Sequence, residues 1–125
     1  MLNSIKLKNK ILKVPIIQGG MGVGISLSNL VGNVMSENAM GVLSFAHPGY
    51  NRNTFLKNTS EDNFIAMKEE VKNARKISNG KGLLGVNIMV ATSEYALYVK
   101  ECVKLGVDAI ISGAGLPLNL PELTK

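Results

Sequence analysis

Short apolar segments alternate with helix-like segments along the chain, and this alternation predicts the order of its elements. Four apolar runs have the length of strands buried on both faces, at residues 14–18, 40–45, 83–90 and 107–111. Between them, apolar residues recur at helical spacing after residue 26, from 61 to 77 and from 95 to 105. Strands that alternate with helices in this way predict βαβ units and a parallel sheet.

Individual residues predict where the helices begin and end. Ser26 is expected to cap the first helix, and Thr92 or Ser93 to cap the third. Residues 79–80 (Asn-Gly) should end the second helix, and Gly106 the third. The predicted buried side chains of the second and third helices are Phe64, Met67, Val71, Ala74 and Ile77, then Tyr95, Leu97, Tyr98, Cys102, Val103 and Leu105.

Two architectures fit the predicted order of elements, an open doubly wound sheet and a (β/α)8 barrel. A complete barrel needs about 250 residues. The chain has 125 residues and contains four predicted βα units. The polar segment 47–60 is long for a βα loop, and such loops are often functional. Residues 116–125 predict a loop that enters another helix.

Composition narrows the class of protein. The hydrophobic share of 46% and charged share of 18% are typical of a globular domain. The net charge of +5 comes from scattered lysines without an arginine-rich run, so we expect no nucleic-acid partner and some preference for anionic ligands. The uncharged stretch 14–36 is too polar for a membrane span. A single cysteine, Cys102, and the lack of a secretory pattern predict a cytoplasmic protein.

Candidate binding residues follow the predicted strands, because ligands of parallel α/β folds bind at the carboxyl ends of the strands. These positions are residues 18–22, 44–47, Asn87 and 112–115. The glycines after the first strand do not form a dinucleotide fingerprint, since Ile25 stands where the pattern needs glycine. Taken alone, these glycines are better explained by a tight turn into a helix.

Few side chains qualify for chemistry. Asn87 interrupts an apolar run, so its amide needs a partner from the backbone or from a ligand. His47, the only histidine, lies in the polar loop and is interpreted as a solvated or locally bonded side chain. Cys102 lies on an apolar helix face and is interpreted as core packing. The sequence has no His/Cys cluster with metal-ligand spacing, so no metal site is expected.

Three segments, in order along the chain, resemble the nitronate monooxygenase family, formerly called 2-nitropropane dioxygenases. They are PIIQGGMG at residues 15–22, GVNIMV at 85–90 and GVDAIISGAGLP at 106–117. The FMN-dependent enoyl-ACP reductases share much of this pattern. The resemblance implies a TIM barrel that holds FMN at the C-terminal face of its strands, with residues 1–125 forming the N-terminal part of that single domain.

The resemblance also implies site residues and a function. The FMN-binding positions would be Gly20, Met21 and Gly22 after the first strand, Asn87 in the third, and Gly113, Ala114 and Gly115 after the fourth. The implied activity is the oxidation of alkyl nitronates with dioxygen. In the family, the catalytic histidine and the phosphate-binding loops lie in the second half of the barrel, so His47 inherits no catalytic role.

Two alternatives remain open from the sequence. The first is an FMN-dependent enoyl-ACP reductase, in which NAD(P)H reduces the flavin. The second is a non-catalytic half-barrel fragment, because a fold does not guarantee a function. An open half-barrel would expose apolar sheet edges. Its expected partners are a second copy or the missing C-terminal half.

Overall fold

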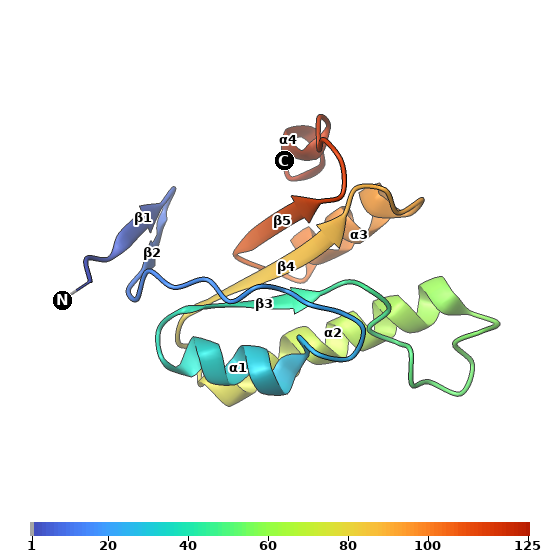
Figure 1. Ribbon diagram of the computed structural model, residues 1–125, viewed down its shortest axis with the longest axis horizontal. Helices are drawn as coiled ribbons and strands as arrows, with labels where there is room; N and C mark the ends of the chain where they lie inside the picture. The colour runs from blue at the N-terminus through green and yellow to red at the C-terminus, as the bar shows by residue number, and fades with distance from the viewer. Residues whose placement is uncertain (1) are drawn as a thin grey trace.

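Three parallel strands form the centre of the structure, a computed structural model that describes residues 2–125 (Figure 1). They are adjacent in the order β3 (Met40–Ser44), β4 (Leu83–Met89) and β5 (Ala109–Gly113). The helices are α1 (Ser28–Ser36) before β3, α2 (Thr59–Ser78) between β3 and β4, α3 (Tyr95–Lys104) between β4 and β5, and the short α4 (Leu120–Leu123). A two-stranded antiparallel hairpin, β1 (Ile5–Leu7) and β2 (Lys10–Leu12), precedes them.

The first predicted strand, residues 14–18, lies beside β3 but contributes only one bridge of parallel pairing. Ile17 and Met40 form that bridge. The Gln18 N–H donates to the Met40 carbonyl at 3.0 Å, and the Met40 N–H donates to the Ile16 carbonyl at 2.9 Å. The predicted order of four neighbouring parallel segments is therefore confirmed, and the first is an extended segment rather than a full strand.

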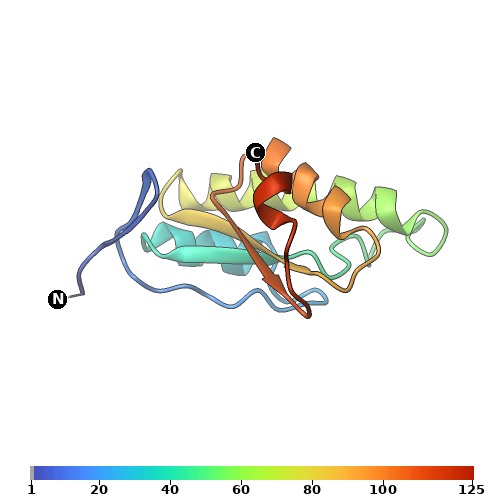
Figure 2. The same cartoon turned by 90° about the horizontal axis from the view of Figure 1, so that it is seen from above.

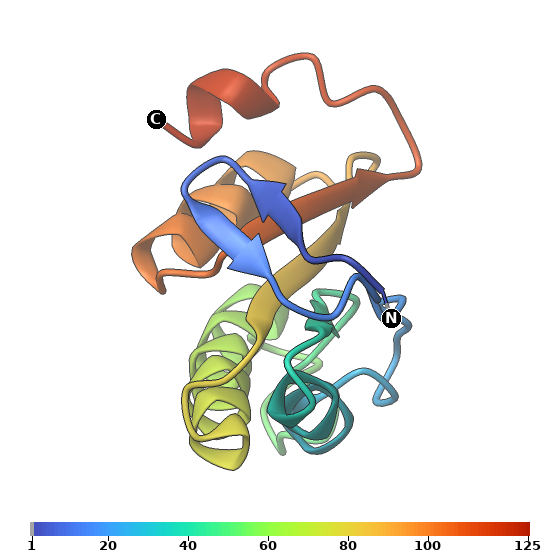
Figure 3. The same cartoon turned by 90° about the vertical axis from the view of Figure 1, so that its left-hand side faces the viewer.

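All three long helices pack on the same face of the sheet. Leu43, Leu84 and Val86 belong to one buried cluster with Val31 of α1 and Val99 of α3, and α2 contributes further members. Figures 2 and 3 show α1, α2 and α3 along this one side of the strands. Helices on one side only were predicted, and an open doubly wound sheet would carry helices on both faces.

The opposite, helix-free face is covered by the hairpin at its N-terminal end and by the turn over the end of β3, and it is open along β5 and at the end of β4. Leu12 of the hairpin is 1% exposed and packs there with Met40, Val42 and Leu83. Figure 1 places the hairpin at the N-terminal ends of the strands. Further along the same face, Ile111 is 37% exposed. Parallel sheets are normally covered on both faces, so this face is unusually open.

Asp108 joins the hairpin and α2 to the start of β5. Its side chain is 5% exposed. Its Oδ2 accepts the Leu84 N–H at 2.8 Å and lies 3.4 Å from Nη2 of Arg75. Lys10 of the hairpin forms an ion pair with Oδ1. One carboxylate thus connects three elements at the N-terminal ends of the strands.

Several predicted boundaries need correction. Ser26 does not cap α1, which has Leu27 at its N-cap position and no side-chain capping bond. Neither Thr92 nor Ser93 caps α3, since Glu94 holds that position. The predicted ends are confirmed: Asn79 adopts the left-handed conformation after α2, with φ 53°. Gly106, just past the end of α3, has φ 70°.

The remaining differences concern the fourth strand and the helix faces. β5 begins at Ala109, two residues after the predicted start, because the Val107 N–H instead closes the end of α3 on the Cys102 carbonyl. Ile77, Leu97 and Val103 were predicted to be buried but are 40%, 55% and 40% exposed. The β1–β2 hairpin was not predicted, because its alternation of lysine and apolar residues is short. The predicted helix in residues 116–125 is confirmed as α4.

Candidate functional site

The turn after the first extended segment and the third predicted strand meet at the C-terminal ends of the strands. Asn87 lies on the helix-free face of β4, as its pairing with Ser44 and Ile111 requires. Its Nδ2 donates to the Gly20 carbonyl at 3.0 Å. Two segments that are 67 residues apart in sequence, both predicted to bind the ligand, are therefore in direct contact.

The glycines of this turn have a packing reason to be glycine. A Cβ atom on Gly20 would lie 2.8 Å from the Asn87 Cβ and 2.9 Å from Val42 Cγ1. A Cβ on Gly22 would lie 2.6 Å from the Ala46 Cβ and 2.7 Å from Ser44 Oγ. Real Cβ atoms do not approach other atoms so closely. The backbone of the turn is thus held against the end of β3 and against Asn87.

The backbone groups of the turn divide into occupied and free ones. The Met21 N–H donates to Ser26 Oγ at 2.8 Å, and the Met21 carbonyl accepts the Ser26 N–H at 2.8 Å. The N–H groups of Gly20 and Gly22 have no hydrogen-bond partner within residues 2–125. Met21 therefore offers a ligand only its side chain, which is 61% exposed, whereas the two glycines offer backbone donors.

The third predicted binding segment, residues 113–115, lies further along the same edge. Gly113 pairs with Met89, whereas Ile111 pairs with Asn87. Two residues along a strand span about 6–7 Å. Gly115 has φ 148°, and a Cβ on it would lie 2.9 Å from the Val90 Cβ. No hydrogen bond in the described chain joins residues 113–115 to the turn or to Asn87, so this segment flanks the contact and does not form it.

The long loop that contains His47 is ordered by contacts with the start of α2. Arg52 Nε donates to Asp62 Oδ1 at 2.9 Å, and Thr54 Oγ1 donates to Asp62 Oδ2 at 2.7 Å. His47 is exposed and packs edge-on against Phe55, with ring centroids 5.5 Å apart. These contacts agree with the interpretation of His47 as a loop residue with local partners.

Cys102 is fully buried in α3, which confirms that it packs in the core. Burial raises the pKa of its thiol to about 12, and the nearby charge of Glu101 adds to the effect. Burial also raises the pKa of Tyr98 on the same helix. A thiol in this state is not a nucleophile at neutral pH.

Two polar residues, Gln18 and Ser26, bond to the turn and to each other. Gln18 was among the candidate positions 18–22, whereas Ser26 was predicted only as a helix cap. Ser26 is 1% exposed, and Gln18 is half-buried. Their side chains bond to each other at 3.0 Å, from Gln18 Nε2 to Ser26 Oγ. The sequence signal for Gln18 is a polar amide at the end of an apolar run, much as Asn87 is a polar amide within one.

The N-terminus of α1 could in principle bind an anion, because it lies directly after the turn. Its Ser28 N–H instead donates to the Glu70 carboxylate of α2 at 2.5 Å. An internal carboxylate therefore already occupies the position that a phosphate group would take at this helix.

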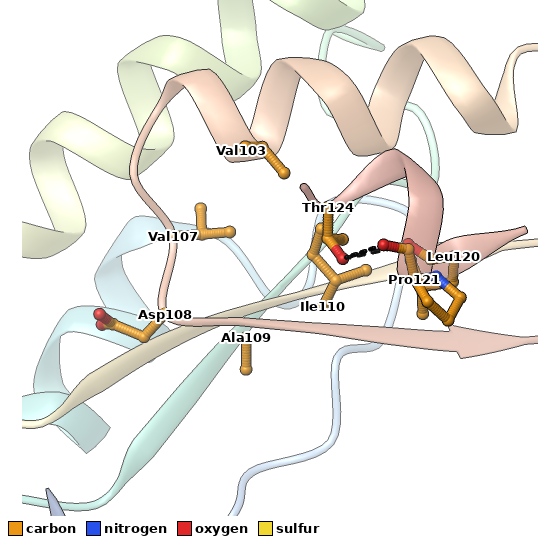
Figure 4. Close-up of a pocket in the computed structure, with 8 residues that line it drawn as sticks. All are labelled: Val103, Val107, Asp108, Ala109, Ile110, Leu120, Pro121 and Thr124. Carbon is orange, nitrogen blue, oxygen red and sulfur yellow. Dashed lines mark hydrogen bonds between the residues drawn. The ribbon is translucent and has the colours of Figure 1, made fainter. Parts of the chain in front are cut away.

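A cavity of about 470 Å³ lies elsewhere, between α3, α4 and the unpaired edge of β5 (Figure 4). Its lining residues are Val103, Val107, Asp108, Ala109, Ile110, Leu120, Pro121 and Thr124. None of them was predicted to bind a ligand. The Thr124 hydroxyl in its wall donates to the Leu120 carbonyl at 3.1 Å. This cavity is a gap beside an edge strand and does not contact the turn.

Comparison with known proteins assigns no family. The chain matches no family model and no curated protein sequence. In the part of the chain that the structure describes, no helix is both long and apolar enough to cross a membrane. Within residues 2–125, no three His, Cys, Asp or Glu side chains are grouped to hold a metal ion.

Proposed function

We propose that residues 1–125 are the N-terminal half of a (β/α)8-barrel flavoenzyme that oxidises alkyl nitronates with dioxygen. The observation that carries the proposal is the contact between Asn87 and the Gly20 carbonyl. It brings two of the three segments that resemble nitronate monooxygenases together, at the strand ends where barrel enzymes bind their ligands. Four parallel segments with helices on one side also agree with half of such a barrel.

The residues around this contact suit a flat heterocycle such as the flavin ring. The free N–H groups of Gly20 and Gly22 can donate to ring oxygen or nitrogen atoms. The exposed side chains of Met21, Met89 and Ile111 offer apolar contact nearby. Bound FMN would supply the redox chemistry, in which a nitronate gives up electrons and dioxygen completes the oxidation.

The phosphate of FMN has no equivalent position in the described residues. The helix N-terminus closest to the turn already bonds to Glu70. The net charge of +5 attracts anions only diffusely, and salt screens it. We therefore assign the phosphate site and the catalytic base to a second half-barrel, as the family resemblance implies.

Ligand titration followed by NMR tests the proposal on the 125-residue chain. Riboflavin and FMN should both shift the amide signals of Gly20 and Gly22 and the side-chain amide of Asn87. Their affinities should agree within about threefold, because only the ring is bound. The purified chain should be colourless and inactive towards nitronates. Shifts confined to other residues, or flavin that survives gel filtration, would contradict the proposal.

An enzymatic assay of the complete barrel separates the two flavoenzyme candidates. Oxidation of an alkyl nitronate without NAD(P)H supports the proposed function. NAD(P)H-dependent reduction of an enoyl thioester would instead identify the enoyl-ACP reductase. If neither substrate reacts and the ring does not bind, the non-catalytic fragment becomes the better account.

A further inference from the structure

The turn at residues 19–26 is closed from beneath by one glutamine side chain. The main chain leaves β3 after Gln18, so the Val42 N–H would lose its partner in the sheet. Gln18 Oε1 accepts that N–H at 3.0 Å. Nε2 of the same amide donates to Ser26 Oγ at 3.0 Å. The glutamine side chain therefore continues the sheet pairing and connects it to the far end of the turn.

Ser26 completes the closure with both its side chain and its backbone. Its Oγ accepts the Met21 N–H, and its own N–H donates to the Met21 carbonyl, both at 2.8 Å. Its carbonyl accepts the Ser44 N–H of β3 at 3.1 Å. Ser26 does not cap α1 as predicted. Its hydroxyl can be fully buried because these bonds supply its hydrogen-bond partners.

These bonds determine which backbone groups of the turn stay unpaired. Met21 is bonded through both its N–H and its carbonyl, and Asn87 holds the Gly20 carbonyl. The N–H groups of Gly20 and Gly22 flank these fixed groups and, like those of Gly19 and residues 23–25, have no hydrogen-bond partner in the described chain. A turn fixed in this way keeps these two donors in place without reorganisation when a ligand arrives.

We propose that Gln18 and Ser26 are positioning residues that hold the Gly20 and Gly22 amides ready for a ligand without contacting it. The ligand-binding consequence rests on the proposed function, whereas the closure of the turn does not. Amide hydrogen exchange measures the closure directly, and riboflavin titration measures its consequence. The two measurements together distinguish failure of this inference from failure of the proposed function.

Ser26→Ala is the first variant to test. Its Met21 N–H should exchange at least about tenfold faster, because the bond to Oγ is lost. The Ser44 N–H should keep its rate, because it bonds to the backbone of residue 26. Riboflavin affinity should fall about tenfold. Ser36→Ala is the matched control, since that hydroxyl bonds only to the Asn33 carbonyl within α1 and should affect neither measurement.

Gln18→Met tests the same closure from its other end. The thioether keeps the length of the side chain but cannot donate to Ser26 and is only a weak acceptor for the Val42 N–H. The Val42 and Met21 N–H groups should therefore both exchange at least about tenfold faster. This variant also provides the test if Ser26→Ala does not fold.

The outcomes are distinct. Unchanged Met21 exchange in both variants would overturn the inference. Faster exchange with riboflavin affinity unchanged within twofold would overturn the positioning role. If the unmodified chain binds no riboflavin, the proposed function fails, and the exchange rates alone decide whether Gln18 and Ser26 hold the turn.

Discussion

The two faces of the sheet differ in how completely they are covered. On the helix-covered face, Leu43, Leu84 and Val86 are at most 1% exposed beneath three helices. On the helix-free face, Leu12 closes the N-terminal end, but Ile111 and Met89 are 37% and 48% exposed. The turn lies over the end of β3 on this second face, beside the open part. The difference indicates that the helix-covered face contributes most of the buried core, while part of the other face stays exposed.

The largest expected effect is on the covered face. Leu84→Ala should lower the free energy of unfolding by about 2–5 kcal/mol, because Leu84 is fully buried and its removal leaves a cavity. Urea unfolding followed by circular dichroism measures the change. A loss below about 1 kcal/mol would show that the covered face is not the main source of stability.

Thiol labelling tests whether the covered face is as dry as its packing implies. At pH 8, Cys102 should react about a thousandfold more slowly in the native protein than in urea, since its pKa is raised from 9.0 to about 12. Because the folded pKa is the higher one, this thiol stabilises the fold fully below pH 9, and that stabilisation is lost as the pH rises towards 12. Rapid labelling without urea would contradict the burial of α3 against the sheet.

Asp108 tests the closed end of the helix-free face. Asp108→Ala should lower the free energy of unfolding by about 1–3 kcal/mol, because the buried Leu84 N–H loses its side-chain partner. Asp108→Asn keeps an acceptor for that N–H and should lose less than about 1 kcal/mol, since Lys10 and Arg75 are 44% and 37% exposed. Urea unfolding of both variants provides the comparison. If both variants lose the same free energy of unfolding, Asp108 stabilises the fold through its charge and not through its bond to the Leu84 N–H.

The covered face was the more predictable of the two. The helical spacing of Met67, Val71 and Ala74 identified three residues that are buried against it. The spacing of apolar residues was less reliable in α3, where it wrongly predicted that Leu97 and Val103 are buried. Val103 is exposed because it lines the open cavity between α3, α4 and β5. Leu97 is 55% exposed on the same helix, whose contact with α2 is made by Tyr98.

The candidate site was predictable only in part. Asn87 was identified because an amide within an apolar strand needs a partner, and the structure supplies the Gly20 carbonyl. The sequence could not show that Ser26 bonds to Met21, because its position before a helix equally fits a cap. Side chains that act across a turn depend on the path of the backbone, which local spacing does not encode.

Asn87 tests the open end of the helix-free face. In a protein with the complete barrel, Asn87→Ala should weaken FMN binding about tenfold, because the Gly20 carbonyl loses its donor and the turn loses one fixed point. Fluorescence titration measures the affinity. Asn33→Ala, on the exposed surface of α1, is a matched control that should leave it unchanged. An unchanged affinity in Asn87→Ala would remove this residue from the site.

The smallest effect is expected at Ile111, the counterpart of Leu84 on the helix-free face. Ile111→Ala removes a side chain that is already 37% exposed, so the free energy of unfolding should change by no more than about 1 kcal/mol. The measurement is made at several protein concentrations, because a second copy that covered this face would stabilise it by mass action. A loss comparable to that of Leu84→Ala, increasing with concentration, would show that the helix-free face is covered in solution. A small loss that does not depend on concentration supports a face that is open and free to bind a ligand.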